Sequence, residues 1–119
     1  MAELWSRMVF HVAVSNCDDH LRNHGFLLES QGWRLSPAYD INPDPTGSGL
    51  ALDIAEADNR LSVDLVRSVS PYFGLDRNAA DRRLKEILGV VSRWRVRARS
   101  LGISRREIES MSPAFHASL

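Results

Sequence analysis

The chain has 119 residues, of which 44% are hydrophobic, and this suits one folded domain. Its 15 basic and 15 acidic side chains cancel, which excludes a general electrostatic attraction to nucleic acid or anionic lipid. A single cysteine, Cys17, excludes a disulfide framework and a four-cysteine zinc site. No apolar run approaches the ~20 residues that span a bilayer, and no signal peptide is recognisable. We therefore predict a cytoplasmic protein.

The first element predicted is a buried helix that ends at about Ser15. Apolar side chains recur there at helical spacing, with Leu4, Met8 and Val12 on one face. The polar residues 16–24 interrupt this pattern, and we predict that they form a loop or an irregular turn. Catalytic side chains are often carried by a loop that is held in this way between regular elements.

Two short β-prone runs, residues 26–28 and 33–35, follow the polar segment. They are joined through Ser30-Gln31-Gly32, and a glycine-containing turn between two such runs predicts a β-hairpin. Pro37 is expected to end the hairpin. Residues 42–49 contain two prolines and two glycines, which predicts an exposed loop.

The rest of the chain is predicted to be helical. Ser62 is expected to cap one helix, with Leu61 and Val66 placed as a hydrophobic staple, and Asp76 is expected to cap the next. Pro71 is expected to bend or end the first of these helices.

An apolar face is predicted to run along the second of these helices and to end near Gly102, which is placed as a C′ glycine. Its members are Leu84, Leu88, Val91, Trp94, Ala98 and Leu101. Ser104 and Glu107 form a capping box that opens a last short helix, and Pro113 is expected to close it.

Three oxygen-bearing side chains form the strongest chemical signal. Asn23 lies five residues after Asp18, and Asp40 follows the predicted hairpin. Phosphoryl transfer needs one carboxylate that accepts the proton of the attacking hydroxyl, and further oxygens that hold magnesium against the phosphates. Protein kinases present these groups in this order and with the same first spacing. The pattern therefore favours a phosphoryl-transfer site.

The residues around these positions resemble HipA-like kinases. Residues 16–26, Asn-Cys-Asp-Asp-His-Leu-Arg-Asn-His-Gly-Phe, resemble the Asp-x-His-x-x-Asn catalytic loop of that family. Residues 33–41, Trp-Arg-Leu-Ser-Pro-Ala-Tyr-Asp-Ile, resemble its metal-binding segment, in which Tyr-Asp-Ile or Tyr-Asp-Leu replaces Asp-Phe-Gly. The resemblance continues through the helical tail to residues 111–115.

The resemblance implies a role for each matched residue. Asp18 is the implied catalytic base, Asn23 and Asp40 are the implied magnesium ligands, and His20 is implied to position the loop. The family consists of bacterial serine/threonine protein kinases that use ATP and Mg²⁺, and many are toxins restrained by a small helix-turn-helix antitoxin. The implied fold is α+β and mostly α-helical, a partial C-terminal kinase lobe with one short β-hairpin. We predict a single partial domain over residues 1–119.

The sequence departs from the family before the catalytic loop. No glycine or lysine precedes Asn16, and the only lysine, Lys85, lies in a predicted helix far downstream. Gly47 and Gly49 follow the metal-binding segment and lack the lysine of a P-loop. We therefore expect that the ATP-binding N-lobe is absent, that no nucleotide-binding residue can be assigned, and that the chain alone binds ATP weakly and is inactive. It could be a truncated product, a remnant or one half of a split kinase.

Several partners follow from this expectation. A helix-turn-helix antitoxin or a separate N-lobe polypeptide could bind the chain, and the substrate would be a protein serine or threonine. Without an N-lobe, Leu4, Trp5, Val9 and Phe10 are expected to be exposed, which predicts self-association through the first helix. A non-catalytic partner-binding module is the alternative function.

Other interpretations of the polar residues remain open. His20 and His24 are four residues apart and could share a zinc ion, although the glutamate of a zincin motif is missing. His11 is predicted to be a hydrogen-bonded residue on an apolar helix.

The arginine-rich segment, with Arg93, Arg95, Arg97 and Arg99 around Trp94, could contact nucleic acid. Alternate residues spread around a helix, however, so a solvated surface is favoured. Trp5, Trp33 and Trp94 are predicted to be core aromatics.

Overall fold

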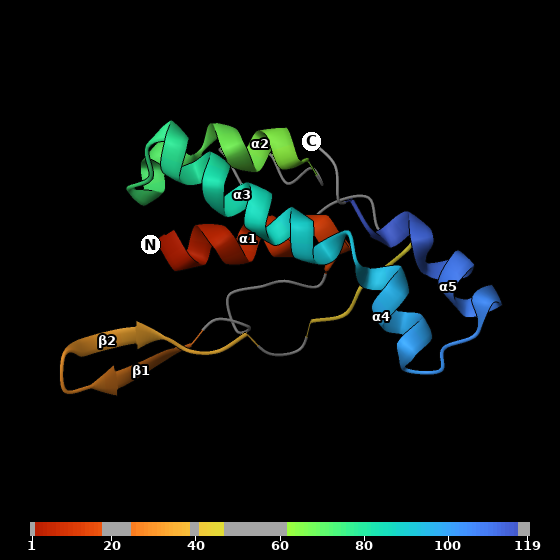
Figure 1. Ribbon diagram of the computed structural model, residues 1–119. Coiled ribbons are helices and arrows are strands. Elements are labelled where there is room, and N and C mark those ends of the chain that lie inside the picture. Colours follow the sequence, from red (N-terminus) through yellow and green to blue (C-terminus); the bar gives the residue numbers. More distant parts are fainter. Residues whose placement is uncertain (1, 18–24, 39–40, 47–61, 117–119) are drawn as a thin grey trace.

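The structure is a computed structural model, and it describes residues 2–17, 25–38, 41–46 and 62–116 (Figure 1). The fold is mostly helical and contains one two-stranded antiparallel hairpin, as predicted. In chain order the elements are α1 (Ala2–Val14), β1 (Phe26–Glu29), β2 (Gly32–Leu35), α2 (Val63–Ser68), the 3₁₀ helix η2 (Ser70–Phe73), α3 (Arg77–Val91), α4 (Trp94–Ser100), α5 (Arg105–Met111) and the 3₁₀ helix η3 (Ser112–Ala114). Within these ranges no helix has the length and apolar character needed to cross a bilayer.

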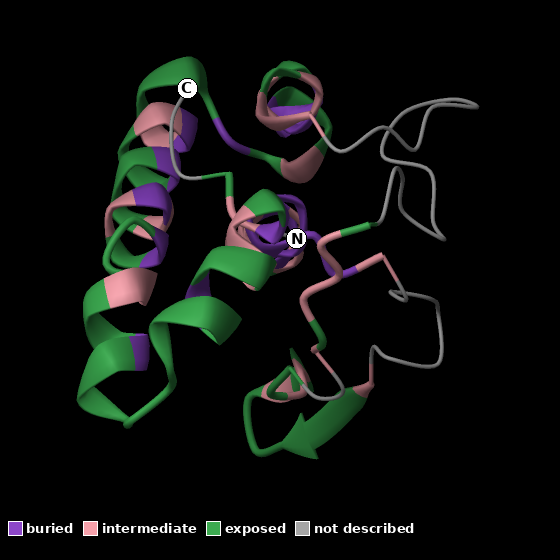
Figure 2. Ribbon diagram, turned by 90° about the vertical axis from the view of Figure 1, so that its right-hand side faces the viewer, coloured by how far each residue is buried: buried purple, intermediate pink, exposed green. Residues whose placement is uncertain are grey.

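The core is built around α1. Trp5, Val9 and Val12 of α1 are buried against Val66 of α2 and Leu84 of α3. The Trp5 indole N–H donates a hydrogen bond of 2.8 Å to the Val66 carbonyl oxygen, so this large side chain is buried without leaving its polar atom unpaired. Figure 2 shows the buried residues of α3 on the side that faces α1.

The predicted exposure of the first helix is wrong for Trp5 and Val9. The helices α2 and α3 cover both side chains almost completely, and Leu4 and Phe10 are half-buried. The apolar surface on which we based self-association through this helix is therefore occupied by the chain itself at these two residues.

The helix starts follow the capping residues of the sequence. The side chains of Ser62, Asp76 and Ser104 accept hydrogen bonds from backbone N–H groups three residues later, which confirms all three predicted caps. Pro71 lies at the start of η2, just after α2 ends, where its missing N–H costs no hydrogen bond. Leu61, the first member of the predicted staple, lies outside the described residues.

The apolar face predicted to continue to Leu101 is interrupted at residues 92–93, where α3 ends and α4 begins. Leu84, Leu88 and Val91 are buried, whereas Leu101 is 63% exposed. The turn changes the direction of the chain, so the α4 face no longer points into the α1–α3 core. Gly102 has a φ of 82°, which confirms the predicted C′ glycine.

The hairpin places most of its apolar residues on one face, and Leu27 lies on the other. The register pairs Phe26 with Leu35 and Leu28 with Trp33, so these four side chains lie on the same side of the two strands. Figure 1 shows the hairpin projecting from the helices. Trp33 is 71% exposed, so its prediction as a core residue is wrong. Two β-prone runs and a turn predict the hairpin, but not what covers its apolar face.

Candidate functional site

The four residues predicted to carry the chemistry, Asp18, His20, Asn23 and Asp40, lie outside the described residues. The same is true of His24, the second member of the possible zinc pair. Among the residues that are described, no group of three His, Cys, Asp or Glu side chains could hold a metal ion. The structure does describe the residues that flank the two motif segments and hold their ends in place. We call these residues, Arg7, Ser15, Asn16 and Asn42, the frame.

A buried asparagine, Asn16, joins the two motif segments. It is only 1% exposed, and its side-chain oxygen accepts a hydrogen bond of 3.2 Å from the backbone N–H of Asn42. Asn16 comes two residues before Asp18, and Asn42 comes two residues after Asp40. This hydrogen bond therefore holds the start of the first motif close to the end of the second.

The other end of the Asn16 amide is held by His11. Asn16 Nδ2 lies 2.9 Å from His11 Nδ1, and His11 is 2% exposed on α1. Because an amide nitrogen can only donate, His11 Nδ1 is the acceptor, and a neutral imidazole then carries its proton on Nε2. The prediction that His11 is a hydrogen-bonded residue on an apolar helix is confirmed.

Ser15 forms a second anchor at the end of α1. Its carbonyl oxygen accepts a hydrogen bond of 3.0 Å from the Asp44 N–H, and its hydroxyl donates one of 2.6 Å to the Ala114 carbonyl oxygen. His116 Nε2 lies 2.9 Å from the same hydroxyl, and the His116 N–H donates to the Ala13 carbonyl oxygen at 2.6 Å. The C-terminal segment is thereby attached directly to the start of the catalytic-loop motif.

Ser15 is also strained. Its φ is 57°, a left-handed conformation that costs a residue with a Cβ about 1–2 kcal/mol. Such conformations persist only where surrounding contacts enforce them, and they are frequent at functional sites. Here the enforcing contacts are the three hydrogen bonds made by the serine hydroxyl and carbonyl groups.

The base of the hairpin is tied to α1 by Arg7. The Ser36 N–H donates to the Gly25 carbonyl oxygen at 2.7 Å, which closes the hairpin. Arg7 Nη2 then donates to the Ser36 carbonyl oxygen at 2.5 Å, and the arginine side chain is 8% exposed. Its other terminal nitrogen, Nη1, is buried and has no hydrogen-bond partner among the residues that the structure describes. Arg7 thus restrains the segment that leads toward Asp40.

Sequence reasoning missed the frame residues Arg7, Ser15, Asn16 and Asn42. Arg7 and Asn16 did carry a signal, because each is a polar residue in or next to the apolar pattern of the first helix. A polar side chain in such a position must be hydrogen-bonded if it is buried. Apart from His11, which lies five residues before Asn16, the partners could not be read from the sequence, because they lie 26 or more residues away.

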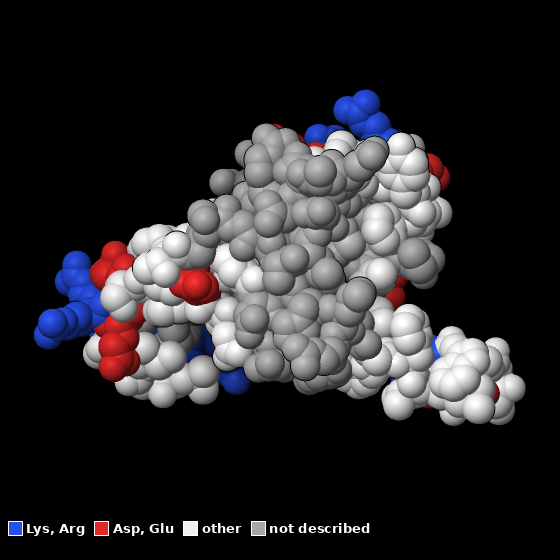
Figure 3. Space-filling model, turned by 180° about the vertical axis from the view of Figure 1, so that it is seen from behind, with Lys and Arg blue, Asp and Glu red and all other residues white. Residues whose placement is uncertain are grey.

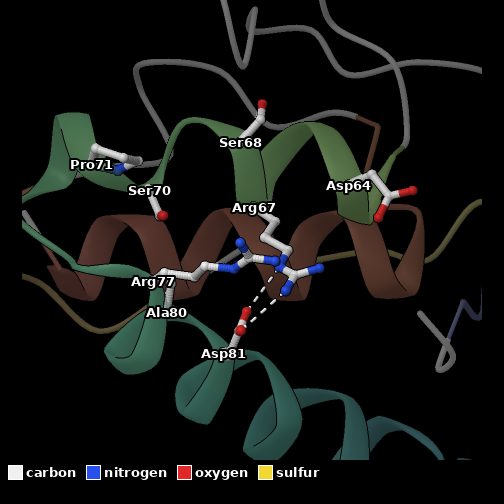
Figure 4. Close-up of a pocket in the computed structure, with 8 residues that line it drawn as sticks. All are labelled: Asp64, Arg67, Ser68, Ser70, Pro71, Arg77, Ala80 and Asp81. Carbon is white, nitrogen blue, oxygen red and sulfur yellow. Dashed lines mark hydrogen bonds and ion pairs between the residues drawn. The ribbon is translucent and has the colours of Figure 1, made fainter.

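A hollow of about 350 Å³ lies elsewhere, between α2, η2 and the start of α3 (Figure 4). Arg67 spans it and binds both carboxylate oxygens of Asp81 at 2.8 and 3.0 Å. Hydrogen bonding to Asp81, together with its negative charge, raises the pKa of Arg67 above its ordinary value. Arg77 reaches into the same hollow in Figure 4. Because Arg67 is already paired, this cluster serves to hold α2 on α3.

Comparison with protein families finds that residues 1–94 match the HipA-like C-terminal domain. This match covers both motif segments, all of α1 to α3 and the first residue of α4. Neither the curated proteins nor the solved structures compared with the chain give a significant match.

Proposed function

Because the chain belongs to the family of HipA-like C-terminal domains, a kinase-family region, we propose that residues 16–42 carry the phosphoryl-transfer site of a serine/threonine protein kinase. The observation that supports this most directly is the hydrogen bond between the Asn42 N–H and the Asn16 side chain. It joins the residue two before Asp18 to the residue two after Asp40, next to the end of α1, as a site shared between the two segments requires.

In this proposal each motif residue has one task. Asp18 accepts the proton of the substrate hydroxyl, and His20 positions the loop around it. The amide oxygen of Asn23 and the carboxylate of Asp40 hold Mg²⁺, which prefers oxygen ligands of this kind. The bound metal ion would neutralise the charge that develops on the transferred phosphoryl group.

The nucleotide needs further groups. A kinase places a glycine-rich loop and a lysine over the ATP phosphates, and the only lysine here, Lys85, is exposed on α3. We therefore propose that these groups come from outside the 119 residues, for example from a separate N-lobe polypeptide. The proposed regulator is a helix-turn-helix antitoxin, and the proposed substrate is a protein serine or threonine.

The metal site can be tested without ATP, by adding Mn²⁺ in place of Mg²⁺ and recording the amide NMR signals. Paramagnetic broadening should begin at the described residues nearest the motifs, Cys17, Gly25, Ile41 and Asn42. The double variant Asn23→Ala/Asp40→Asn should lose this broadening. Asp64→Asn, which removes an exposed carboxylate on α2, should retain it.

Two results would contradict the metal assignment. One is equal broadening in the double variant, and the other is broadening centred on Asp64 or Asp81. The nucleotide claim is tested separately by calorimetric titration of the chain with Mg²⁺ and ATP. Micromolar affinity of the chain alone would show that no outside loop or lysine is needed.

A second candidate function is a non-catalytic binding module. It is favoured by the hairpin face, on which Phe26, Leu28 and Trp33 are all more than half exposed. An isolated two-stranded hairpin is marginally stable in water, so we expect a partner to pack against this apolar face. The proposed partner is the N-lobe polypeptide. A pure binding module would keep its affinity for that polypeptide in Asp40→Asn and lose it in Trp33→Ser, with no Mn²⁺ effect in the parent chain.

A further inference from the structure

An apolar groove lies between α4 and α5. Of the described residues that line it, only Trp94 falls within the part of the chain matched by the family. Its volume is about 570 Å³. The apolar side chains that line it include Trp94, Ala98, Leu101, Ile103, Met111 and Phe115. None of the described residues among 16–42 lines it, and the inference below does not depend on the proposed phosphoryl-transfer site.

Several contacts give the groove firm walls. Trp94 stacks on Phe115 with ring centroids 4.0 Å apart and planes 9° from parallel. Arg95 Nη1 binds Glu109 Oε1 at 2.6 Å, which holds α4 to α5. Ala98 and Ile108 are buried beneath. The groove is therefore preformed and does not need to open before it binds a partner.

The groove leaves large apolar side chains in water. Leu101 is 63% exposed and Ile103 is 42% exposed. Burying such side chains against a partner is favourable by about 25 cal/mol for each Å² removed from water. Many proteins bind an amphipathic helix by burying its apolar face in a hydrophobic groove of this kind.

The charge around the groove selects the partner. Residues 93–111 contain six arginines and two glutamates, a net charge of +4 in a chain whose total charge is zero. Arg95 is paired with Glu109, but in the described part of the chain the other five arginines form no ion pair. Figure 3, seen from behind, shows basic and acidic side chains side by side at this end of the molecule. The unbalanced positive charge calls for an acidic partner.

We propose that this groove binds an acidic amphipathic helix of a partner protein. The two helices that form it have seven residues each, about 10 Å of helix at 1.5 Å per residue. That length accommodates about two turns of a bound helix, with two or three apolar side chains spaced three or four residues apart. Acidic side chains on its flanks then face the unpaired arginines.

Nucleic acid is the competing partner, and the groove argues against it. Phosphate contacts supply most of the affinity in a non-specific complex, and they need a continuous basic surface. The α4 arginines instead alternate around the helix, and the space between α4 and α5 is lined mainly by aliphatic and aromatic side chains.

The test is a selection of displayed random 15-residue peptides on the 119-residue chain. Counter-selection uses the variant Leu101→Ser/Ile103→Ser, whose two positions are exposed and so tolerate a polar residue. Val90→Ser, which removes an equally exposed apolar side chain on α3, is the matched control. We expect enriched peptides with apolar residues at helical spacing and an excess of Asp and Glu.

The best enriched peptide then serves as a probe in fluorescence anisotropy. We expect its affinity to fall at least tenfold in Leu101→Ser/Ile103→Ser and at least threefold in Arg97→Glu, and to stay within twofold in Val90→Ser and Arg82→Glu. No enrichment, enrichment without an acidic bias, or equal binding to the groove variant would overturn the proposal. Displacement of the peptide from the groove by a short DNA duplex at lower concentration than by unlabelled peptide would also overturn it, in favour of nucleic acid.

Discussion

The core of α1, α2 and α3 and the periphery, formed by the hairpin and by α4 and α5, contain apolar side chains in similar patterns but use them differently. In the core, Trp5, Val66 and Leu84 lie within one closed cluster. In the periphery, Trp33 and Leu101 are mostly exposed. Periodicity therefore reports the secondary structure in both regions, whereas only tertiary contacts decide which apolar face serves stability and which is available for binding.

The largest expected effect distinguishes two tryptophans. Trp5→Ala should lower the free energy of unfolding by about 3–5 kcal/mol, because it leaves a large cavity and removes one of the two hydrogen bonds to the Val66 carbonyl oxygen, which keeps the bond from the Val69 N–H. Trp33→Ala should change it by no more than about 0.5 kcal/mol, because the side chain is mostly in water. Urea denaturation followed by far-UV circular dichroism measures both. Equal losses would show that the hairpin is part of the core.

Two leucines give the same comparison with a smaller difference. Leu84→Ala on α3 should cost about 2–5 kcal/mol, since its side chain is almost fully buried. Leu101→Ala, beside the groove, should cost about 0.5 kcal/mol or less. The substitution is identical, so unfolded-state effects largely cancel between the two variants, although Leu84 lies within α3 and Leu101 is the C-cap residue of α4. A large loss from Leu101→Ala would mean that α4 and α5 belong to the core.

The sequence predicts best what is decided locally. The caps at Ser62, Asp76 and Ser104 each depend on a hydrogen bond that spans three residues, and all three were predicted correctly. The hairpin likewise follows from two short runs and one turn. The core position predicted for Trp5 is confirmed, whereas the exposure expected for Trp5 without an N-lobe and the core position predicted for Trp33 are wrong. Exposure is harder to predict because it depends on helices and loops far away in the chain.

The candidate site divides in the same way. Its motif residues could be predicted from spacing and from family resemblance, and their roles remain predictions because these residues lie outside the described ranges. The frame residues could not be predicted, because the Asn16–Asn42 bond spans 26 residues and the Ser15–Ala114 bond spans 99. Contacts of such separation depend on the completed fold and leave no periodic pattern in the sequence.

The hydrogen bond between Asn16 and Asn42 gives a third prediction. Asn16→Ala should cost about 1–3 kcal/mol, because His11 Nδ1 and the Asn42 N–H both lose a buried partner. Asn78→Ala, at an exposed position of α3, should stay within about 0.5 kcal/mol. Native-state hydrogen exchange at the Asn42 amide should accelerate in the first variant only. Unchanged exchange there would show that Asn16 does not hold the second motif.

The smallest expected effect concerns the strained backbone at Ser15. Ser15→Ala and Ser15→Gly both remove the hydroxyl and its bonds to Ala114 and His116, so their difference reports the backbone alone. With φ at 57°, glycine should be the more stable of the two by about 0.5–1 kcal/mol, because it has no Cβ to clash and this outweighs its greater loss of chain entropy. At Ser92, where φ is −59°, the order should reverse, since alanine suits that conformation. The same order at both positions would mean that the end of α1 is unstrained, and the anchor between the C-terminal segment and the catalytic-loop motif would then be a passive contact.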